Sequence, residues 1–347
     1  MTLEAKKSSP LNPLKKILKV RGMPSALTAF VGLIIIYIGF GLIDPVVFNE
    51  ANIHNLFRAT SKYVLIGIGQ SFVLITGNID LSIGSVVGMS AMTSATLMAN
   101  GVAVPLALLI SLILCLAVGI LNGFLIGNFK LPPFIATLGT MFVGRGIAFM
   151  VNGNRNTDAI SSGIGREAAT TFGNFFYYGR TFGIFNTFWI ALIVFIIFFF
   201  ILQKTKTGRH IYAIGSNEDA AKLSGVSVGG TVTKVYIVSA FCSFLVGTIL
   251  AAQAGMGNME AGAMYEMFGV AASVIGGVSP LGGSGILLGT FAGAAVWQVL
   301  ANGLSMVGAQ VGIQRLMVGI IVALAVLLDV VLRRHGTLFS KKKQKQS

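Results

Sequence analysis

Charged residues are scarce in this sequence, and so are cysteines. Charged residues make up 10% of the 347 positions and hydrophobic residues 54%, whereas a soluble domain carries about 25% charged residues. With a mean hydropathy of +0.83, the composition excludes an ordinary soluble domain and indicates a polytopic membrane protein. The two cysteines, Cys115 and Cys242, fall inside apolar runs. We therefore expect packing residues and no disulfide framework.

Motifs that carry chemistry are also missing. The sequence contains no GxxxxGK[ST] phosphate-binding loop, no HExxH, no GxSxG and no cluster of His and Cys with ligand spacing. His54, His210 and His335 all lie in polar segments, where solvated side chains are expected. The chain is thus predicted to have no catalytic residues, no metal site and no bound cofactor, and it cannot hydrolyse ATP through such a loop.

Glycine, by contrast, is abundant, at 44 of the 347 residues. In lipid, small residues let helix backbones approach closely, so this content favours a helical bundle over a β-barrel. The predicted fold class is an all-α polytopic membrane protein with about ten transmembrane helices, some of them short or broken.

Positive charge gathers beside the apolar runs and gives the chain a net charge of +14. Lys and Arg cluster in 1–22, in and beside 204–228, and in 333–347. By the positive-inside rule, both termini and the central loop are expected to be cytoplasmic. We predict basic tails at 1–22 and 333–347 around a membrane domain at 23–332, with contact to anionic lipid and no nucleic-acid partner. The first apolar run has no cleavage pattern and is taken as a retained span.

Ten apolar runs are predicted to cross the membrane, which agrees with two cytoplasmic termini. Two of them, Tyr63–Thr76 and Met267–Val278, are short for a bilayer of about 30 Å. Before the first of these, Asn49 is expected to open a short amphipathic helix at the outer surface, and the polar segment Asn152–Phe185 is expected to be extracytoplasmic. The other eight runs are Met23–Ile43, Leu81–Met98, Pro105–Phe129, Phe134–Val151, Asn186–Gln203, Thr231–Gln253, Gly285–Ser305 and Gly312–Leu332.

Two glycine-containing segments resemble each other. ITGNIDLSIGSVVG begins at Ile75 and VIGGVSPLGGSGILLG at Val274, and each follows a short apolar run and opens a longer one. This pattern is typical of broken helices. Irregular backbone at membrane depth is tolerated only where protein or a water-filled cavity satisfies it.

Polar residues within these runs are candidates for a solute path. Asp80 lies in the first glycine-containing segment, and an intramembrane carboxylate suggests function, although a structural helix cap carries at least equal weight. Asn78, Ser82, Asn122 and Asn302 are further candidates. Like Gln70, Gln253 and Gln298, they could equally serve interhelical hydrogen bonding, which is the commoner role. For Arg145 and Arg315, a structural role is favoured over solute contact.

The polar stretch 204–228 contains a short helix signal. Ser216 or Asn217 can cap its start, acidic residues follow, and Gly225 supplies a left-handed exit. Because two turns of helix are marginal on their own, the segment is either a docking surface or a plain connector between two spans.

Several motifs together resemble the permease subunits of bacterial ABC importers for simple sugars, a family that includes the ribose, xylose, galactose and autoinducer-2 permeases. They are TGNIDLSIGS, GRHIYAIGSNEDAAKLSGV, MYEMFGVAASVIGGVSPLGGSG and LANGLSMVG, in matching order along most of the chain.

The resemblance implies a multi-pass protein of the bacterial inner membrane that pairs with a second permease copy or a paralogue. Its further partners would be a cytoplasmic ATPase, often with two nucleotide domains in one chain, which uses the ATP, and a periplasmic or lipid-anchored solute-binding protein. The segment Gly215–Gly225 would be the coupling helix that inserts into the ATPase. Its candidate contact residues are Gly215, Asn217, Glu218, Ala220, Ala221, Leu223, Ser224 and Gly225.

Two departures from the family pattern concern the solute. Relatives usually have two glycines where this chain has Gly77-Asn78, and an acidic residue where it has Phe268, which therefore joins the candidates for the path. The expected function is import of a monosaccharide (pentose or hexose) or a related small polar solute. The alternative is an ion-coupled secondary transporter with Asp80 as its coupling carboxylate. A membrane enzyme is disfavoured, because the sequence contains no recognisable constellation of acid, base or nucleophile.

Overall fold

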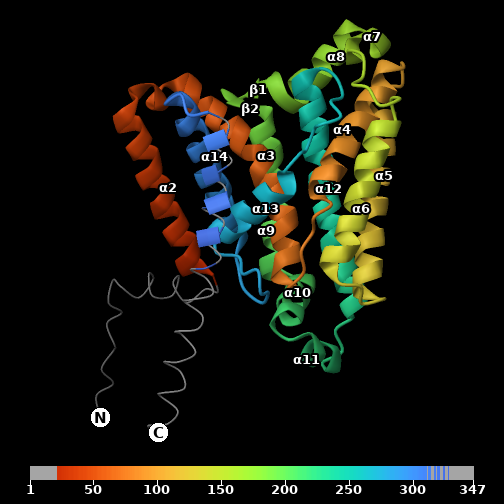
Figure 1. Ribbon diagram of the computed structural model, residues 1–347, viewed down its shortest axis with the longest axis vertical. Helices are drawn as coiled ribbons and strands as arrows, with labels where there is room; N and C mark the ends of the chain where they lie inside the picture. Colours follow the sequence, from red (N-terminus) through yellow and green to blue (C-terminus); the bar gives the residue numbers. More distant parts are fainter. Residues whose placement is uncertain are drawn as a thin grey trace, which may run out of the picture.

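The computed structural model describes residues 22–310 and scattered helical residues between 312 and 327. Both predicted basic tails, most of the predicted span Gly312–Leu332, Arg315 and His335 lie outside the described residues. The described chain is helical apart from one small hairpin (Figure 1). Its elements are α2 Met23–Ile43, η1 Pro45–Phe48, α3 Glu50–Ile75, α4 Ile83–Ala99, α5 Val104–Gly127, α6 Pro133–Met150, α7 Ile160–Ile164, α8 Arg166–Gly173, η2 Asn174–Tyr178, β1 Arg180–Thr181, β2 Ile184–Phe185, α9 Asn186–Lys204, α10 Lys206–Ser216, α11 Glu218–Leu223, α12 Val228–Ala254, α13 Tyr265–Ile275 and α14 Leu287–Met306.

Six of these helices are long and apolar enough to cross a membrane, namely α2, α5, α6, α9, α12 and α14. The predicted membrane fold with a mixture of long and short helices is confirmed at this level. Helix α13 has only 11 residues, as its short apolar run predicts, and α4 has 17.

One local prediction is wrong. The expected surface helix at Asn49 and the expected short span Tyr63–Thr76 form one continuous helix, α3, of 26 residues. Asn49 does cap it, since its Oδ1 accepts a hydrogen bond from the Ala51 N–H at 3.0 Å. No glycine or proline interrupts the sequence from Glu50 to Ile66, so nothing ends the helix where its composition changes from polar to apolar.

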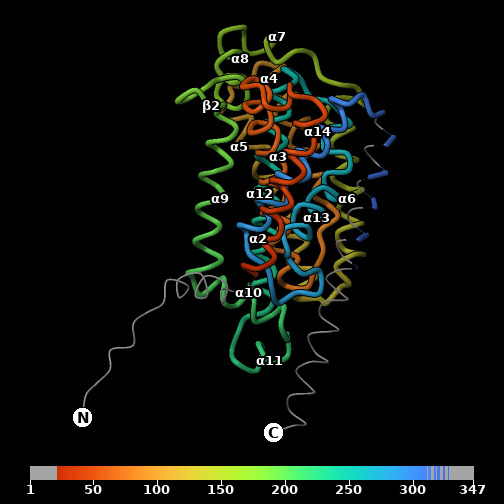
Figure 2. The backbone as a smooth tube through the Cα atoms, turned by 90° about the vertical axis from the view of Figure 1, so that its left-hand side faces the viewer, coloured from red at the N-terminus to blue at the C-terminus, as the bar shows by residue number. Residues whose placement is uncertain are grey.

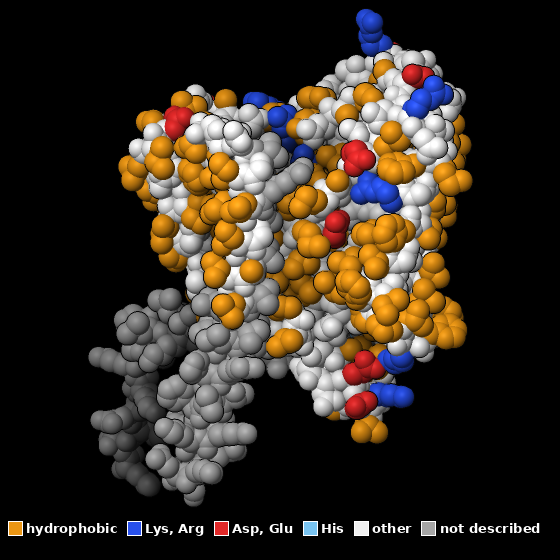
Figure 3. All heavy atoms as spheres, in the orientation of Figure 1, with side chains coloured by type: hydrophobic (Ala, Val, Ile, Leu, Met, Phe, Trp, Pro, Cys, Tyr) orange, Lys and Arg blue, Asp and Glu red, His pale blue; other side chains and the backbone are white. Residues whose placement is uncertain are grey.

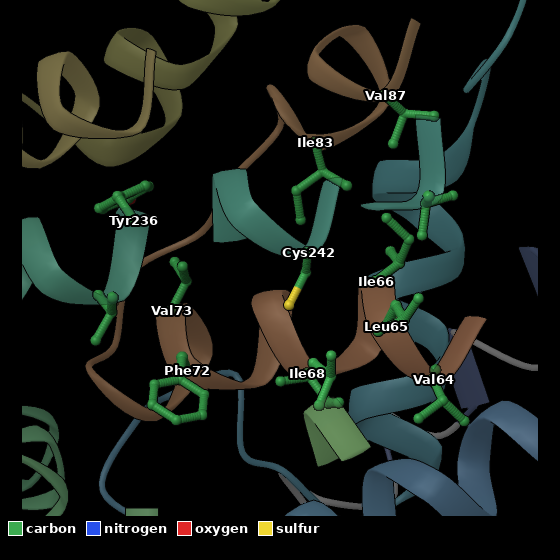
Figure 4. Close-up of a cluster of buried hydrophobic side chains, with 14 of the residues drawn as sticks. Val64, Leu65, Ile66, Ile68, Phe72, Val73, Ile83, Val87, Tyr236 and Cys242 are labelled. Carbon is green, nitrogen blue, oxygen red and sulfur yellow. The ribbon is translucent and has the colours of Figure 1, made fainter. Parts of the chain in front are cut away.

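The buried centre of the bundle is formed by α3, α4 and α12, whose side chains are mostly inaccessible. Figure 4 shows part of it, with Leu65 and Phe72 of α3 and Tyr236 and Cys242 of α12 among the packed side chains. The surrounding helices expose large apolar residues, and hydrophobic side chains are spread along the helices on the face in Figure 3. A surface of this kind is suited to lipid.

The two ends of the molecule carry different additions. Helices α10 and α11 project at one end, while α7, α8, η2 and the hairpin lie at the opposite end (Figures 1 and 2). In the hairpin, Arg180 pairs with Phe185 and Thr181 with Ile184 in antiparallel register.

Candidate functional site

The first glycine-containing segment interrupts the helices between α3 and α4. Helix α3 ends at Ile75, and Gly77 takes a left-handed φ of 80° that turns the chain. Asn78 donates a hydrogen bond from Nδ2 to Thr76 Oγ1 at 2.8 Å. Since α4 begins only at Ile83, residues 76–82 are a non-helical break, which we call the first break.

Asp80 is the centre of this break and is only 3% exposed. Its Oδ1 accepts hydrogen bonds from the Ser82 N–H at 2.9 Å and the Ser82 hydroxyl at 2.6 Å. Its Oδ2 accepts from the hydroxyl of Ser239 on α12 at 2.7 Å. Both carboxyl oxygens are therefore occupied, one by the start of α4 and the other by a neighbouring helix.

The hydrogen bonds continue from Ser82 into two further helices. Asn122 of α5 donates from Nδ2 to Ser82 Oγ at 3.0 Å, and Thr140 of α6 donates to Asn122 Oδ1 at 2.7 Å. The structure thus brings three predicted path residues, Asp80, Ser82 and Asn122, into one buried network.

Sequence reasoning missed three partners of this network. Tyr236 of α12 donates to the Ile79 carbonyl at 2.9 Å, one helical turn from Ser239, and Thr140 ends the chain of hydrogen bonds on α6. The only available signal was the three-residue spacing of Tyr236 and Ser239, which places both side chains on one helix face.

The other predicted path residues lie outside this network. Phe268 of α13 stacks on Trp297 with ring centroids 5.2 Å apart. Asn302 of α14 exchanges side-chain hydrogen bonds with Asn52 at 3.1 and 3.3 Å. Asn78, Phe268 and Asn302 are all half-buried, so each retains some accessible surface.

Arg145 of α6 has a structural role, as expected. It donates hydrogen bonds to the carbonyls of Met259 and Ala261 at 3.0 and 2.9 Å. It therefore holds the connection between α12 and α13 against α6.

The second glycine-containing segment, residues 276–286, separates α13 from α14 and forms the second break. A Cβ added at Gly289 would overlap the carbonyl oxygen of Gly276, so the two backbones are in direct contact. Backbone bonds also shape this segment, for example from Ser279 N–H to the Ser284 carbonyl at 3.0 Å. Tyr212 of α10 donates to the Gly285 carbonyl at 2.7 Å.

The two breaks meet each other and α10 at one point. Ile75, the last residue of α3, accepts a hydrogen bond from the Gly283 N–H at 2.9 Å. A Cβ on Gly215 would overlap the same Ile75 carbonyl, and one on Gly282 would lie 2.8 Å from the Gly215 carbonyl. We call Gly77, Gly215, Gly282 and Gly283 the glycine junction. Close contacts leave no room for a side chain at Gly215, Gly282 and Gly283, and Gly77 is favoured by its left-handed φ of 80°.

Beyond this junction the chain forms the predicted short helix, α11. Of the two proposed caps Asn217 is the one used, since its Oδ1 accepts from the Ala220 N–H at 2.8 Å. Glu218 forms an ion pair with Lys130 in the turn between α5 and α6. Gly225 has the expected left-handed φ, at 80°.

The candidate docking residues divide into two groups. Gly215 belongs to the glycine junction and Ala221 is buried. These two residues therefore pack α10 and α11 against the rest of the protein. Leu223 is 90% exposed at the tip of the segment. The remaining candidates, Asn217, Glu218, Ala220, Ser224 and Gly225, are also exposed.

In the part of the chain that the structure describes, no three His, Cys, Asp or Glu residues come together as a group that could hold a metal ion.

Comparisons with known proteins agree on one family. Residues 52–326 match the family model described as branched-chain amino acid transport system / permease component. The chain is 36% identical to the ribose import permease protein of Bacillus subtilis over 93% of this chain and 98% of that protein. It is 34% identical to the D-allose transport system permease protein of Escherichia coli over 87% and 90% of the two chains. Identity to the autoinducer 2 import system permease protein of Salmonella typhi is 31% over 77% and 74%. No solved structure is significantly similar to the chain.

Proposed function

The chain belongs to the family described as branched-chain amino acid transport system / permease component, and from this premise we propose that it imports a monosaccharide, pentose or hexose, or a related small polar solute. It is a permease subunit of an ATP-binding-cassette importer and a multi-pass protein of the bacterial inner membrane. It is not an enzyme and binds no cofactor, because in this family a separate subunit hydrolyses ATP.

The names of the relatives support a sugar as the solute. The family description names branched-chain amino acids, but the relatives that align over most of the chain are named for ribose, D-allose, galactose and autoinducer 2. These solutes are small and rich in hydroxyl or carbonyl groups, unlike an amino acid with an apolar side chain.

A membrane importer of this family works with an ATPase and a solute-binding protein. In the arrangement we propose, ten spans place both termini and α10–α11 in the cytoplasm, as the basic clusters favour. The ATPase, with its nucleotide domains in tandem in one chain or in separate chains, then meets α11, and a second permease copy or a paralogue completes the pore. The binding protein, periplasmic or lipid-anchored, meets the opposite end, where α7 and α8 lie (Figure 1).

The observation that carries the docking proposal is the exposed Leu223. An apolar side chain that is 90% exposed beyond the membrane part of a bundle gains stability by entering a partner's groove. Asn217, Glu218, Ala220, Ser224 and Gly225 surround it as polar or small contacts. Gly215, on the preceding helix α10, passes any movement of this segment to the end of α3 and to the second break, since it touches Ile75 and Gly283.

For the solute path, we assign two roles to the predicted residues. Asp80, Ser82 and Asn122 form a fixed wall, because all three are buried and hydrogen bonds join them to one another and to α12. Asn78, Phe268 and Asn302 retain accessible surface and are the members of the set that can contact a passing solute.

The docking proposal is tested by Leu223→Asp. We expect co-purification with the ATPase to fall by about tenfold or more, which corresponds to roughly 1.4 kcal/mol or more, while the thermal stability of the permease is unchanged. The matched control is Phe182→Asp, because Phe182 is equally exposed, at 90%, but lies in the hairpin at the opposite end. Equal ATPase association of wild type and Leu223→Asp would make the segment a plain connector.

The solute is tested by uptake into proteoliposomes that contain the whole importer, with D-ribose, D-allose and leucine as probes. Uptake of a sugar that requires both ATP and the binding protein is the expected result. Uptake of leucine alone would overturn the sugar assignment and leave the importer assignment intact.

A further inference from the structure

Among the described residues, several buried polar side chains have no hydrogen-bond partner, and Gln70 is the one amide among them. Gln70 lies on α3, close to the end of the helix, and is 0% exposed. Neither its Oε1 nor its Nε2 has a hydrogen-bond partner among the residues that the structure describes. Buried amides are normally hydrogen-bonded, so an unpaired one calls for an explanation.

Neighbouring polar groups of the same contact are all paired. Ser71 donates to Ser273 Oγ at 2.9 Å and lies 2.7 Å from Thr290 Oγ1, while Ser273 donates to the Gly269 carbonyl at 2.8 Å. We call the contact formed by Gln70, Ser71, Gly269 and Ser273 the α3–α13 seam. The seam satisfies its hydroxyl groups internally and leaves only the amide of Gln70 without a partner.

The seam is tightly closed over Gln70 by the backbone of α13. A Cβ added to Gly269 would lie 3.3 Å from the Cβ of Gln70 and 2.8 Å from Cγ2 of Ile66. Helix α13 is only 11 residues long, and left-handed residues flank it at both ends, Met264 with φ 67° and Gly277 with φ 85°. A short helix between two such connections can shift as a unit relative to α3.

We propose that Gln70 is a specificity-determining residue that hydrogen-bonds to the solute during its passage, when α13 moves away from α3. This role rests on the proposed function, sugar import, and identifies one residue that contacts the sugar. A primary amide offers two donors and an acceptor with two lone pairs. This combination matches a sugar, whose hydroxyl groups each donate and accept. As a neutral group, the amide adds no charge at membrane depth.

The assignment also explains why the amide is left unpaired in the closed seam. A group that must bind and then release a passing solute cannot also hold a strong partner within the protein. Asp80 shows the opposite arrangement, since three donors occupy its two oxygens. The unpaired amide and the occupied carboxyl group therefore have different roles.

The test uses the complete importer in proteoliposomes, with saturating D-ribose-loaded binding protein and ATP. Gln70→Met keeps the length of the side chain and removes the amide. We expect the number of D-ribose molecules imported per ATP hydrolysed to fall by about fivefold, as for the loss of one hydrogen bond, while ATPase stimulation by the binding protein persists. The matched control is Thr248→Val, which removes a different fully buried polar group without a described partner, a hydroxyl on α12.

A second variant keeps the test decisive if Gln70→Met does not assemble. Gln70→Asn retains the amide but withdraws it by one methylene, so the ratio of uptake rates for D-ribose and its C3 epimer D-xylose is expected to change by at least about threefold. An unchanged ratio, or an unchanged import per ATP in Gln70→Met, would overturn the role of Gln70. A wild-type importer that takes up no monosaccharide would instead overturn the proposed function.

Discussion

The two breaks have similar sequences but are held in different ways. The first break is held by side-chain hydrogen bonds, through which Asp80, Ser82, Asn122 and Ser239 connect it to α5 and α12. In the second break, backbone lies directly on backbone, as at Gly276 and Gly289. The first break is held by hydrogen bonds that converge on Asp80. The second is held by close backbone contacts that a side chain would prevent.

This difference indicates different mechanical properties. A hydrogen-bond network has a preferred geometry for every member, so the first break is expected to be rigid. The hydrogen bonds of the second break run to backbone carbonyls and do not converge on one buried side chain, so this break and the short helix α13 are better suited to movement. At the glycine junction α10 contacts the second break and Ile75, the residue just before the first break, which gives a moving coupling segment access to each.

The largest effect is expected for Asp80→Ala. The substitution leaves the Ser82 N–H and the hydroxyls of Ser82 and Ser239 without their acceptor in a buried site. We expect the free energy of unfolding to fall by about 3–5 kcal/mol, measured by equilibrium unfolding in SDS micelles. Stability equal to that of wild type would show that the first break is not held by this hub.

A smaller loss is expected at the second break for Gly289→Ala. The added methyl group would overlap the Gly276 carbonyl, so α13 and α14 must separate slightly, at a cost of about 1–3 kcal/mol. The same unfolding experiment measures it. The control is Gly139→Ala on α6, where an added Cβ meets nothing within 4 Å and where alanine is expected to be neutral or stabilising.

Ser239→Ala is expected to have the smallest effect. It removes one of the three donors to Asp80 and should cost about 1–2 kcal/mol. Ser243→Ala is the control, because the Ser243 hydroxyl bonds only to the Ser239 carbonyl of its own helix, at 2.9 Å.

A double-mutant cycle then sharpens the comparison. If Asp80 is the hub, Asp80→Ala combined with Ser239→Ala should destabilise by clearly less than the sum of the two single changes. Additive losses would mean that the two residues stabilise the break independently.

The membrane helices could be predicted well because apolar length is a local signal. The boundaries of α5, α6 and α9 agree with their apolar runs within a few residues. The first surface helix was wrong for an instructive reason. A change from polar to apolar composition shows where the chain enters the apolar environment. A helix ends only where the backbone is interrupted, and α3 runs without interruption to Ile75, just before the left-handed Gly77.

The candidate site was predictable only in part. Asp80, Ser82 and Asn122 stand out because polar residues are rare in apolar runs, and the structure brings these three together. Phe268 and Asn302 stand out for the same kind of reason, yet they lie in other contacts. A residue type that is rare in its surroundings can be singled out from the sequence, but the sequence does not show which other residues it contacts.

The sequence by itself determined the membrane class, a short helix capped at Ser216 or Asn217 and the left-handed exit at Gly225, because these depend on neighbours within a few residues. Only the tertiary structure decided which partners occupy Asp80, that Gly215 lies between Ile75 and Gly283, and that Gln70 has no partner among the described residues. Each of these depends on how helices distant in the sequence pack against one another. That packing decides whether a buried polar group is held in place or left available.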